Sequence, residues 1–219
     1  MTVAGAALVT TGAQAQSILS YNVSNARLSG FGAWSHTYSG TITPLGGGLA
    51  NYTGGSGTLN DGSVSNTASN NMLFLAGDNS VITLFLSGTF QLSSLTLFGG
   101  VNAANVIPGT LTGATIGFGG GSVALTSAPS NPGCLSGNCD DTFSFGGSAL
   151  AGLNGNTITL SNFQGNFFAD HYSISEIGLS GIPVSTVPEP ASFVLMLAGL
   201  GALGVVARRR TRQPTFLLR

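Results

Sequence analysis

The segment Asn156-Thr-Ile-Thr-Leu-Ser-Asn-Phe163 decides the fold class of this chain. In an extended strand Ile158 and Leu160 lie on one face, and Thr157 and Thr159 lie on the other, because successive side chains alternate between faces. This alternation is typical of an antiparallel strand that has one face in a core and one in water. The segment therefore predicts an antiparallel sheet.

The neighbouring segments indicate further strands separated by glycine-rich turns. Residues 81–87 are apolar on both faces, which is typical of a central strand, and we expect residues 90–98 to pair with them across a tight turn at Ser87-Gly88. Residues 111–118 and 122–126 form a second predicted pair, joined at Gly119-Gly120-Gly121. Each pair is short and local, as in antiparallel β-proteins.

The segment 172–182 closes the predicted domain, and its apolar positions change parity near Ser175-Glu176, which indicates a β-bulge there. Residues 44–71 and 127–140 are expected to be long surface connections. No helical periodicity of useful length occurs before residue 191. The pattern predicts an all-β fold, an antiparallel β-sandwich of the jelly-roll type. A β-helix is the alternative, but the chain has no fixed-period repeat.

The composition is that of an exported β-protein and argues against nucleic-acid binding. Charged residues make up 6% of the chain, against about 25% in an average soluble domain. Lysine is absent, and Arg27 is the only arginine before residue 208. The body is acidic, and phosphate binding needs clustered Lys and Arg. Its acidic residues are Asp61, Asp78, Asp140, Asp141, Asp170 and Glu176.

The first residues have the features of a secretory signal. Residues 1–15 are apolar and end in Ala13-Gln14-Ala15, a small-x-small triplet of the kind that signal peptidase recognises. A basic n-region is not present in this stretch, so we expect residues 1–15 to be a signal-peptide remnant. The alternative is a buried apolar strand or the start of a helix.

The other end predicts a membrane span. Residues 191–207 are uncharged and apolar, and a helix of that length reaches roughly 25 Å, slightly less than a hydrocarbon core of about 30 Å. Arg208, Arg209 and Arg210 follow at once and are expected to stay on the cytoplasmic side. We therefore expect a transmembrane helix over 191–207 and a basic cytoplasmic tail over 208–219.

The segment before this span, Val187-Pro188-Glu189-Pro190, cannot continue a helix or a central strand because of its two prolines. This motif, the apolar helix and the arginine cluster together resemble the PEP-CTERM sorting signal, over about residues 187–212. The resemblance implies an exosortase as partner, cleavage near the motif, and an inner-membrane precursor that reaches the cell surface or the exterior. Such proteins occur in Gram-negative bacteria that make exopolysaccharide. The same tail is sometimes labelled an ice-binding protein C-terminal domain, a label that does not itself imply binding to ice.

These features predict a β-sandwich domain over residues 16–182 and a linker over 183–190. Residues 81–118 and 156–181 are faintly similar to discoidin-like, galactose-binding-like jelly rolls, without a diagnostic motif. This likeness bears on the fold only.

Two polar features of the body have structural interpretations. Cys134 and Cys139 lie close together in the sequence, and in an oxidising compartment such a pair forms a disulfide. The aspartates at 61, 78, 140 and 141 offer oxygens for calcium, without EF-hand spacing. Aspartate in turns more often bonds to nearby backbone, so we predict no cofactor and keep calcium as the alternative.

Trp34 and Tyr38 alternate with His36 between them, and such a stripe on an exposed face would stack on sugar rings. The same spacing equally fits the core face of one strand, where a lone tryptophan usually packs. We list Trp34 and Tyr38 as candidate carbohydrate contacts.

The sequence offers no catalytic constellation. Asp170-His171 beside many serines does not define a triad, which depends on geometry. A glycosidase needs two positioned carboxylates, and only Glu176 and scattered aspartates are available. We expect a non-enzymatic surface or matrix protein that adheres or associates with exopolysaccharide. The alternatives are a secreted hydrolase and an ice-binding protein, for which Thr41-Ile-Thr43 and Thr157-Ile-Thr159 are too few threonines.

Overall fold

The computed structural model describes residues 18–101, 110–129, 137–166, 171–184 and Met196. Residues up to Val184 belong to one compact unit, and residues from Ser185 onward belong to a second. The strands are β1 (Ile18–Arg27), β2 (Thr41–Gly46), β3 (Leu49–Gly55), β4 (Met72–Leu75), β5 (Val81–Val101), β6 (Thr110–Phe118), β7 (Gly121–Thr126), β8 (Ala128–Pro129), β9 (Gly137–Ser144), β10 (Asn154–Asn166), β11 (His171–Ile174) and β12 (Glu176–Pro183). Two 3-10 turns, η1 (Phe31–Ala33) and η2 (Ala76–Asp78), complete the described elements.

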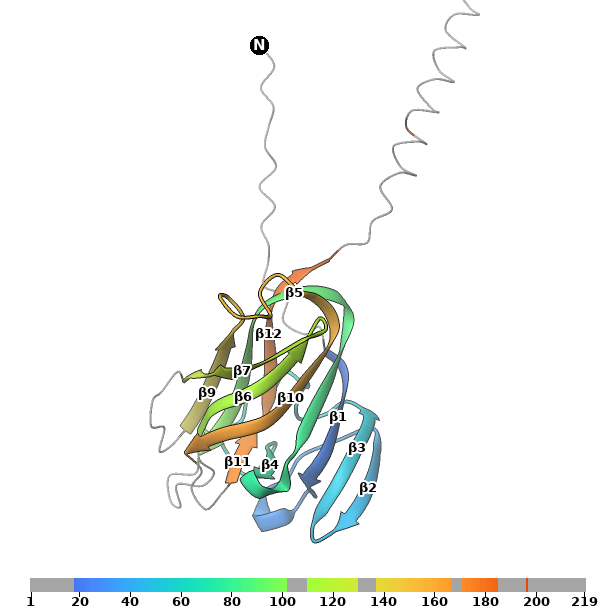
Figure 1. Ribbon diagram of the computed structural model, residues 1–219. Coiled ribbons are helices and arrows are strands. Elements are labelled where there is room, and N and C mark those ends of the chain that lie inside the picture. Colours follow the sequence, from blue (N-terminus) through green and yellow to red (C-terminus); the bar gives the residue numbers. More distant parts are fainter. Residues whose placement is uncertain (1–17, 102–109, 130–136, 167–170, 185–195, 197–219) are drawn as a thin grey trace, which may run out of the picture. The chain divides into compact units, whose positions relative to one another are not determined.

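The strands form a sandwich in which β5 belongs to both layers (Figure 1). One layer has the order β2-β3-β1-β5-β10-β6-β7. The second half of β5 pairs with β12 on one side and with β9 on the other, and β8 pairs with β9. A short ribbon of β4 and β11 lies apart from this path. All pairings between these strands are antiparallel, which confirms the predicted all-β sandwich of jelly-roll type.

The long strand β5 corrects one prediction. Residues 81–87 and 90–98 are not two paired strands, because β5 runs unbroken from Val81 to Val101. At Ser87-Gly88 the register with β10 jumps from Thr157↔Phe85 to Gly155↔Phe90, so extra residues of β5 bulge out of the ladder. A bulge bends a strand, and strands that change layers do so at such bends. The Ser-Gly pair therefore marks a corner and not a hairpin.

Other local predictions agree with the structure. The hairpin of β6 and β7 turns at Gly119 and Gly120, whose φ angles are 58° and 84°. Two successive positive φ angles are typical of a type I′ turn, which glycine adopts without strain. Ile158 and Leu160 of β10 are fully buried, as their alternation predicted.

The region around Ser175 is an irregularity, but it separates two strands and does not interrupt one. β11 pairs with β4, and β12 pairs with β5. Ser175 N–H donates to Phe98 O, and Glu176 is the ladder partner of Phe98. Two residues thus oppose one residue of β5, as in a bulge. The predicted long connections at 44–71 and 127–140 are wrong in part, because they contain strand β3 and much of β9.

The core lies between the layers and is built from both halves of β5. Leu84 comes from the first half and Leu95 from the second, and both are fully buried. Phe143 of β9 and Ile158 of β10 bring the two layers together from the other strands. Because β5 bends at Ser87-Gly88, its two halves lie in different layers. Alternate residues of each half therefore face the same core.

The predicted membrane helix over 191–207 lies outside the described residues except for Met196. Among the residues that the structure describes, no helix is long and apolar enough to cross a membrane. Strand β12 ends at Pro183, and Val184 N–H still donates to Thr89 O at 2.8 Å. The sheet therefore continues slightly past the predicted boundary at residue 182.

Candidate functional site: a neutral cleft at the corner of β5

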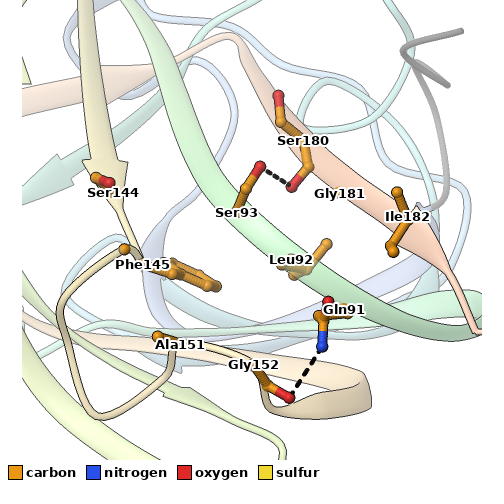
Figure 2. Close-up of a pocket in the computed structure, with 11 residues that line it drawn as sticks. Gln91, Leu92, Ser93, Ser144, Phe145, Ala151, Gly152, Ser180, Gly181 and Ile182 are labelled. Carbon is orange, nitrogen blue, oxygen red and sulfur yellow. Dashed lines mark hydrogen bonds between the residues drawn. The ribbon is translucent and has the colours of Figure 1, made fainter. Parts of the chain in front are cut away.

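A cleft of about 560 Å³ opens beside the corner of β5 (Figure 2). It is bounded by residues 91–93 of β5, residues 144–146 at the end of β9, residues 151–152 before β10, and residues 180–182 of β12. Three separated parts of the chain, residues 91–93, 144–152 and 180–182, meet here because β5 carries the chain from one layer to the other. The fold therefore creates the cleft.

The cleft combines polar and apolar side chains without charge. Its polar side chains are Gln91, Ser93, Ser144 and Ser180. Leu92 and Phe145 are buried at its base, and Ile182 is 47% exposed at its margin. None of the described residues that line it carries an ionisable side chain. Such a lining offers hydrogen bonds and an apolar surface, and it has no general acid or base.

Hydrogen bonds between the walls fix the shape of the cleft. Gln91 Nε2 donates to Gly152 O at 3.1 Å, and Ser93 Oγ donates to Ser180 O at 3.1 Å (Figure 2). Phe145 N–H donates to Ser93 O at 2.9 Å and joins the segment after β9 to β5. Each wall is therefore tied to β5, and the cleft is formed before any ligand arrives.

Gly181 has a steric role in this arrangement. A Cβ at this position would lie 2.4 Å from Gln91 O and 2.8 Å from Leu92 Cα. Any side chain would therefore push β12 away from β5 and open the wall of the cleft. Ser144 and Ser180 are exposed residues of the lining, and their hydroxyls form no hydrogen bond with the described residues.

The candidate contacts Trp34 and Tyr38 lie elsewhere and are turned inward. Trp34 is only 7% exposed. Tyr38 Oη donates to Tyr21 O and accepts from Gly55 N–H, both at 2.8 Å, and the Tyr38 ring packs edge-on against Tyr52 at 5.2 Å. Trp34 and Tyr38 therefore pack inward, which is the alternative that their alternation also allowed. They do not form an aromatic stripe that faces solvent.

His36 belongs to the same aromatic cluster. Its Nε2 lies 3.0 Å from Tyr52 Oη, and Tyr52 Oη donates to Arg27 O. Because the Tyr52 hydroxyl proton is directed at that carbonyl, His36 Nε2 is the donor in this pair. Burial lowers the pKa of His36 to about 4, so the ring is neutral at ordinary pH. The cluster is a structural contact and not an acid–base site.

Two buried carboxyls have raised pKa values but do not form a catalytic pair. Burial raises the pKa of Glu176 and of Asp141 to about 7. Glu176 accepts from Gly62 N–H at 2.7 Å, and Asp141 accepts from Leu111 N–H at 3.2 Å. Across β5, Glu176 is level with Phe98 and Asp141 with Leu97, so the two carboxyls lie on opposite faces of the layer. Neither faces the cleft.

Asp61 and Asp78 make local or structural contacts. Asp61 Oδ1 accepts from Ser63 N–H at 2.8 Å, the backbone bond expected of aspartate in a turn. Asp78 is paired with Arg27. Among the described residues, no group of three or more His, Cys, Asp or Glu could hold a metal ion.

The remaining predicted site residues lie outside the described residues. These are the sorting residues Val187, Pro188, Glu189, Pro190, Arg208, Arg209 and Arg210, together with Cys134. Cys139 is described and is 6% exposed at the start of the β9–β5 pairing. The Cys134–Cys139 disulfide therefore stays a prediction.

Comparison with solved structures gives distant similarities. A family 32 carbohydrate-binding module of Clostridium perfringens NanJ, solved with galactose, is 17% identical, with a TM-score of 0.37 over 66% of this chain and 92% of that chain. A second module from the same organism, solved with GalNAc-β-1,3-galactose, is 17% identical, with a TM-score of 0.39 over 68% and 96%. A fragment of a Bacteroides thetaiotaomicron protein described as a chitobiase is 10% identical, with a TM-score of 0.43 over 82% and 99%. Nothing about the ligand of this chain follows from similarities at this level.

Comparison by sequence identifies the tail. No curated protein matches the chain significantly. The PEP-CTERM protein-sorting motif matches residues 186–210, which contain the Pro188-Glu189-Pro190 segment, the apolar stretch and the three arginines. This match agrees with the resemblance found in the sequence, within two residues at each end. The chain therefore carries a PEP-CTERM sorting signal, and it is an exported protein that an exosortase processes for the cell surface or the exterior.

Proposed function

We propose that this protein is a non-enzymatic surface or matrix protein whose β-sandwich holds a neutral extracellular polysaccharide in the cleft at the corner of β5. The observation that carries the proposal is the lining of the cleft. Its described residues are hydroxyl, amide, glycine and apolar residues, and none is ionisable. A neutral sugar presents hydroxyl groups at its edges and C–H groups on its faces, and these match such a lining in kind.

The size and rigidity of the cleft support a sugar ligand. Its volume of about 560 Å³ falls in the range of small-molecule sites, which is roughly 300–1,000 Å³. The hydrogen bonds from Gln91 to Gly152 and from Ser93 to Ser180 hold its walls in place. A preformed site avoids the cost of ordering side chains on binding, which otherwise reduces affinity. A chain held by such a site on an exported protein would join the protein to the matrix.

The lining also supports a non-catalytic role. Hydrolysis of a glycosidic bond uses two carboxyl groups placed on either side of that bond. The cleft contains no carboxyl among its described residues, and the small cavity at Asp141 contains no second one. The two Thr-Ile-Thr segments lie on β2 and β10, separated by β3, β1 and β5, so they do not form the compact threonine array that ice binding would need.

The test is binding of the exported protein to the neutral exopolysaccharide of its host, measured by isothermal titration calorimetry. Ile182→Asp places a charge at the margin of the cleft and is expected to weaken binding at least about tenfold. Ile42→Asp is the matched control, because Ile42 is 42% exposed, similar to Ile182, but lies on β2 outside the cleft. Equal binding by the two variants, or release of reducing sugar by the wild type, would contradict the proposal.

A further inference from the structure

The edges of the two layers differ in how well they are protected against pairing with another strand. An exposed edge presents unpaired N–H and C=O groups, and proteins block such edges with proline, charge, bulges or covering loops. Strand β2 contains Pro44, and its register with β3 is irregular there. Strand β8 has two residues, one of them Pro129. Strand β12 ends in Pro183, and its outer edge is occupied where Ile177 N–H donates to Leu59 O at 3.0 Å.

Among the residues that the structure describes, strand β7 has none of these protections. Its sequence, Gly121-Ser-Val-Ala-Leu-Thr126, contains no proline and no charge. It pairs with β6 through six successive residues without a register shift, and β6 is its neighbour at the end of the layer (Figure 1). It is therefore a regular, neutral edge strand, which is the form most able to accept another strand.

The hairpin geometry shows which residues of β7 face the open edge. A two-residue turn at Gly119-Gly120 makes its flanking residues, Phe118 and Gly121, a hydrogen-bonded pair. Alternate residues of β7 then bond to β6, and the same parity is seen at Ser127, whose N–H donates to Thr112 O at 3.0 Å. The residues between them direct their N–H and C=O groups outward. These are Ser122, Ala124 and Thr126, all exposed, and none is hydrogen-bonded to a backbone group of the described residues outside β6.

We propose that β7 pairs antiparallel with β7 of a second copy of this chain, so that the layers of two molecules join into one continuous sheet. A two-fold axis at Ala124 places Ala124 opposite itself and Ser122 opposite Thr126 of the second copy. This register uses all three outward-facing residues of each strand. Closed two-fold pairing is the commonest form of homo-oligomer.

A second copy fits this edge because β7 itself meets the requirements of the partner. The hairpin over 110–126 carries no charged residue, so two copies do not repel each other. Val123 and Leu125 face the core but remain half-buried at the margin of the layer. In the proposed register Val123 lies beside Leu125 of the second copy, and each covers the apolar surface that the other leaves open.

Sedimentation of the exported protein over a range of concentrations tests this pairing. The wild type is expected to form dimers. The double variant Ser122→Lys with Thr126→Lys places two pairs of like charges opposite each other in the dimer, one pair on each side of the axis. It is expected to raise the dimer Kd about tenfold or more. Ser122→Lys with Thr126→Glu is the matched control, because the same register then pairs opposite charges and keeps the dimer.

The two double variants change the same exposed positions, so loss of folding would affect both and is checked by circular dichroism. Cross-linking gives a second measurement on the full chain at the cell surface. Ala124→Cys is expected to form a disulfide-linked dimer, whereas Thr159→Cys, exposed on β10, is not. A wild type that stays monomeric, equal dimerisation by both double variants, or an edge that pairs only with unrelated peptides would overturn the proposal.

Discussion

Arg27 and Asp78 form a two-bonded ion pair, with Arg27 Nε 2.7 Å from Asp78 Oδ2 and Nη2 2.5 Å from Oδ1. Arg27 is the only Lys or Arg among the described residues. Its Nη1 also donates to Gly47 O at 2.9 Å, and its guanidinium lies 4.8 Å from the centre of the Phe31 ring. The single cation of the domain thus joins β1, η2, η1 and the turn between β2 and β3.

Removing this cation is expected to destabilise the domain. The two side chains are only 12% and 9% exposed, so Arg27→Ala leaves the Asp78 carboxylate largely buried without its partner. We expect a loss of about 3 kcal/mol in the free energy of unfolding, measured by urea denaturation. Arg27→Lys keeps the charge but loses the forked geometry, and it should cost less. The double variant Arg27→Met with Asp78→Leu should be close to wild type, and a loss as large as that of Arg27→Ala would show that packing and not charge matters here.

The stability of the domain should fall as the pH rises from 4.5 to above 7. Burial raises the pKa of Glu176 from 4.5 to about 7, an effect that the hydrogen bond from Gly62 N–H only partly offsets. A group whose pKa is higher in the folded state binds its proton more strongly there. Its contribution to stability is therefore complete below the unfolded pKa and is lost as the pH passes through about 7. Asp141, also raised to about 7, acts in the same direction.

Glu176→Gln tests this dependence, because glutamine keeps an oxygen for Gly62 N–H and does not ionise. We expect the variant to be more stable than the wild type at pH 8, by on the order of 2 kcal/mol, since the side chain keeps slight contact with water. The two proteins should be nearly equal at pH 4.5. Thermal unfolding at several pH values measures both, and an unchanged slope in the variant would assign the pH dependence to other groups.

The sorting signal gives a prediction about processing. Alanine at Pro188, Glu189 and Pro190 should make the unprocessed precursor accumulate in the inner membrane of an exosortase-bearing host, because the recognised segment is lost. Immunoblots of cell fractions measure the change in size and location. Alanine at residues 213–215, which lie beyond the matched segment 186–210, is the control and should leave processing intact. Unchanged processing of the first variant would refute the role of the motif.

The two cysteines give a prediction about oxidation. Cys134 and Cys139 close a short loop, and the chain-entropy model assigns a disulfide of this loop size roughly 2 kcal/mol. Protein exported natively and alkylated without reductant should keep an intact mass with no added label. After reduction it should take up two labels, and two labels before reduction would exclude the bond.

The sequence was sufficient where structure depends on neighbouring residues. The β6–β7 hairpin follows from Gly119-Gly120, and the burial of Ile158 and Leu160 follows from alternation in one strand. The sorting signal is equally local. The course of β5 was missed because Ser87-Gly88 has the composition of a turn, and only the pairing with β10 and β12 shows it to be a corner.

The cleft could not be predicted in the same way. It joins three separated parts of the chain, and its residues are one glutamine, serines, glycines and apolar residues that have no recognisable spacing. The aromatic residues of the sequence indicated Trp34 as a candidate contact instead. A large apolar ring gains most from burial, however, and the tertiary structure buries Trp34. A neutral cleft of this kind becomes visible only when the layers are assembled.

The most direct test of the account is retention of the exported protein in a native gel that contains the neutral exopolysaccharide of its host. Gly146→Leu adds a bulky apolar side chain to a residue that lines the cleft, without backbone strain, because a Cβ there meets only Ser144 Oγ at 3.6 Å. Gly77→Leu is the matched control, since Gly77 lies outside the cleft and a Cβ there meets nothing within 4 Å. We expect polysaccharide to retard the wild type and Gly77→Leu, and Gly146→Leu to migrate as it does without polysaccharide. Equal retardation of all three, or of none, would contradict it.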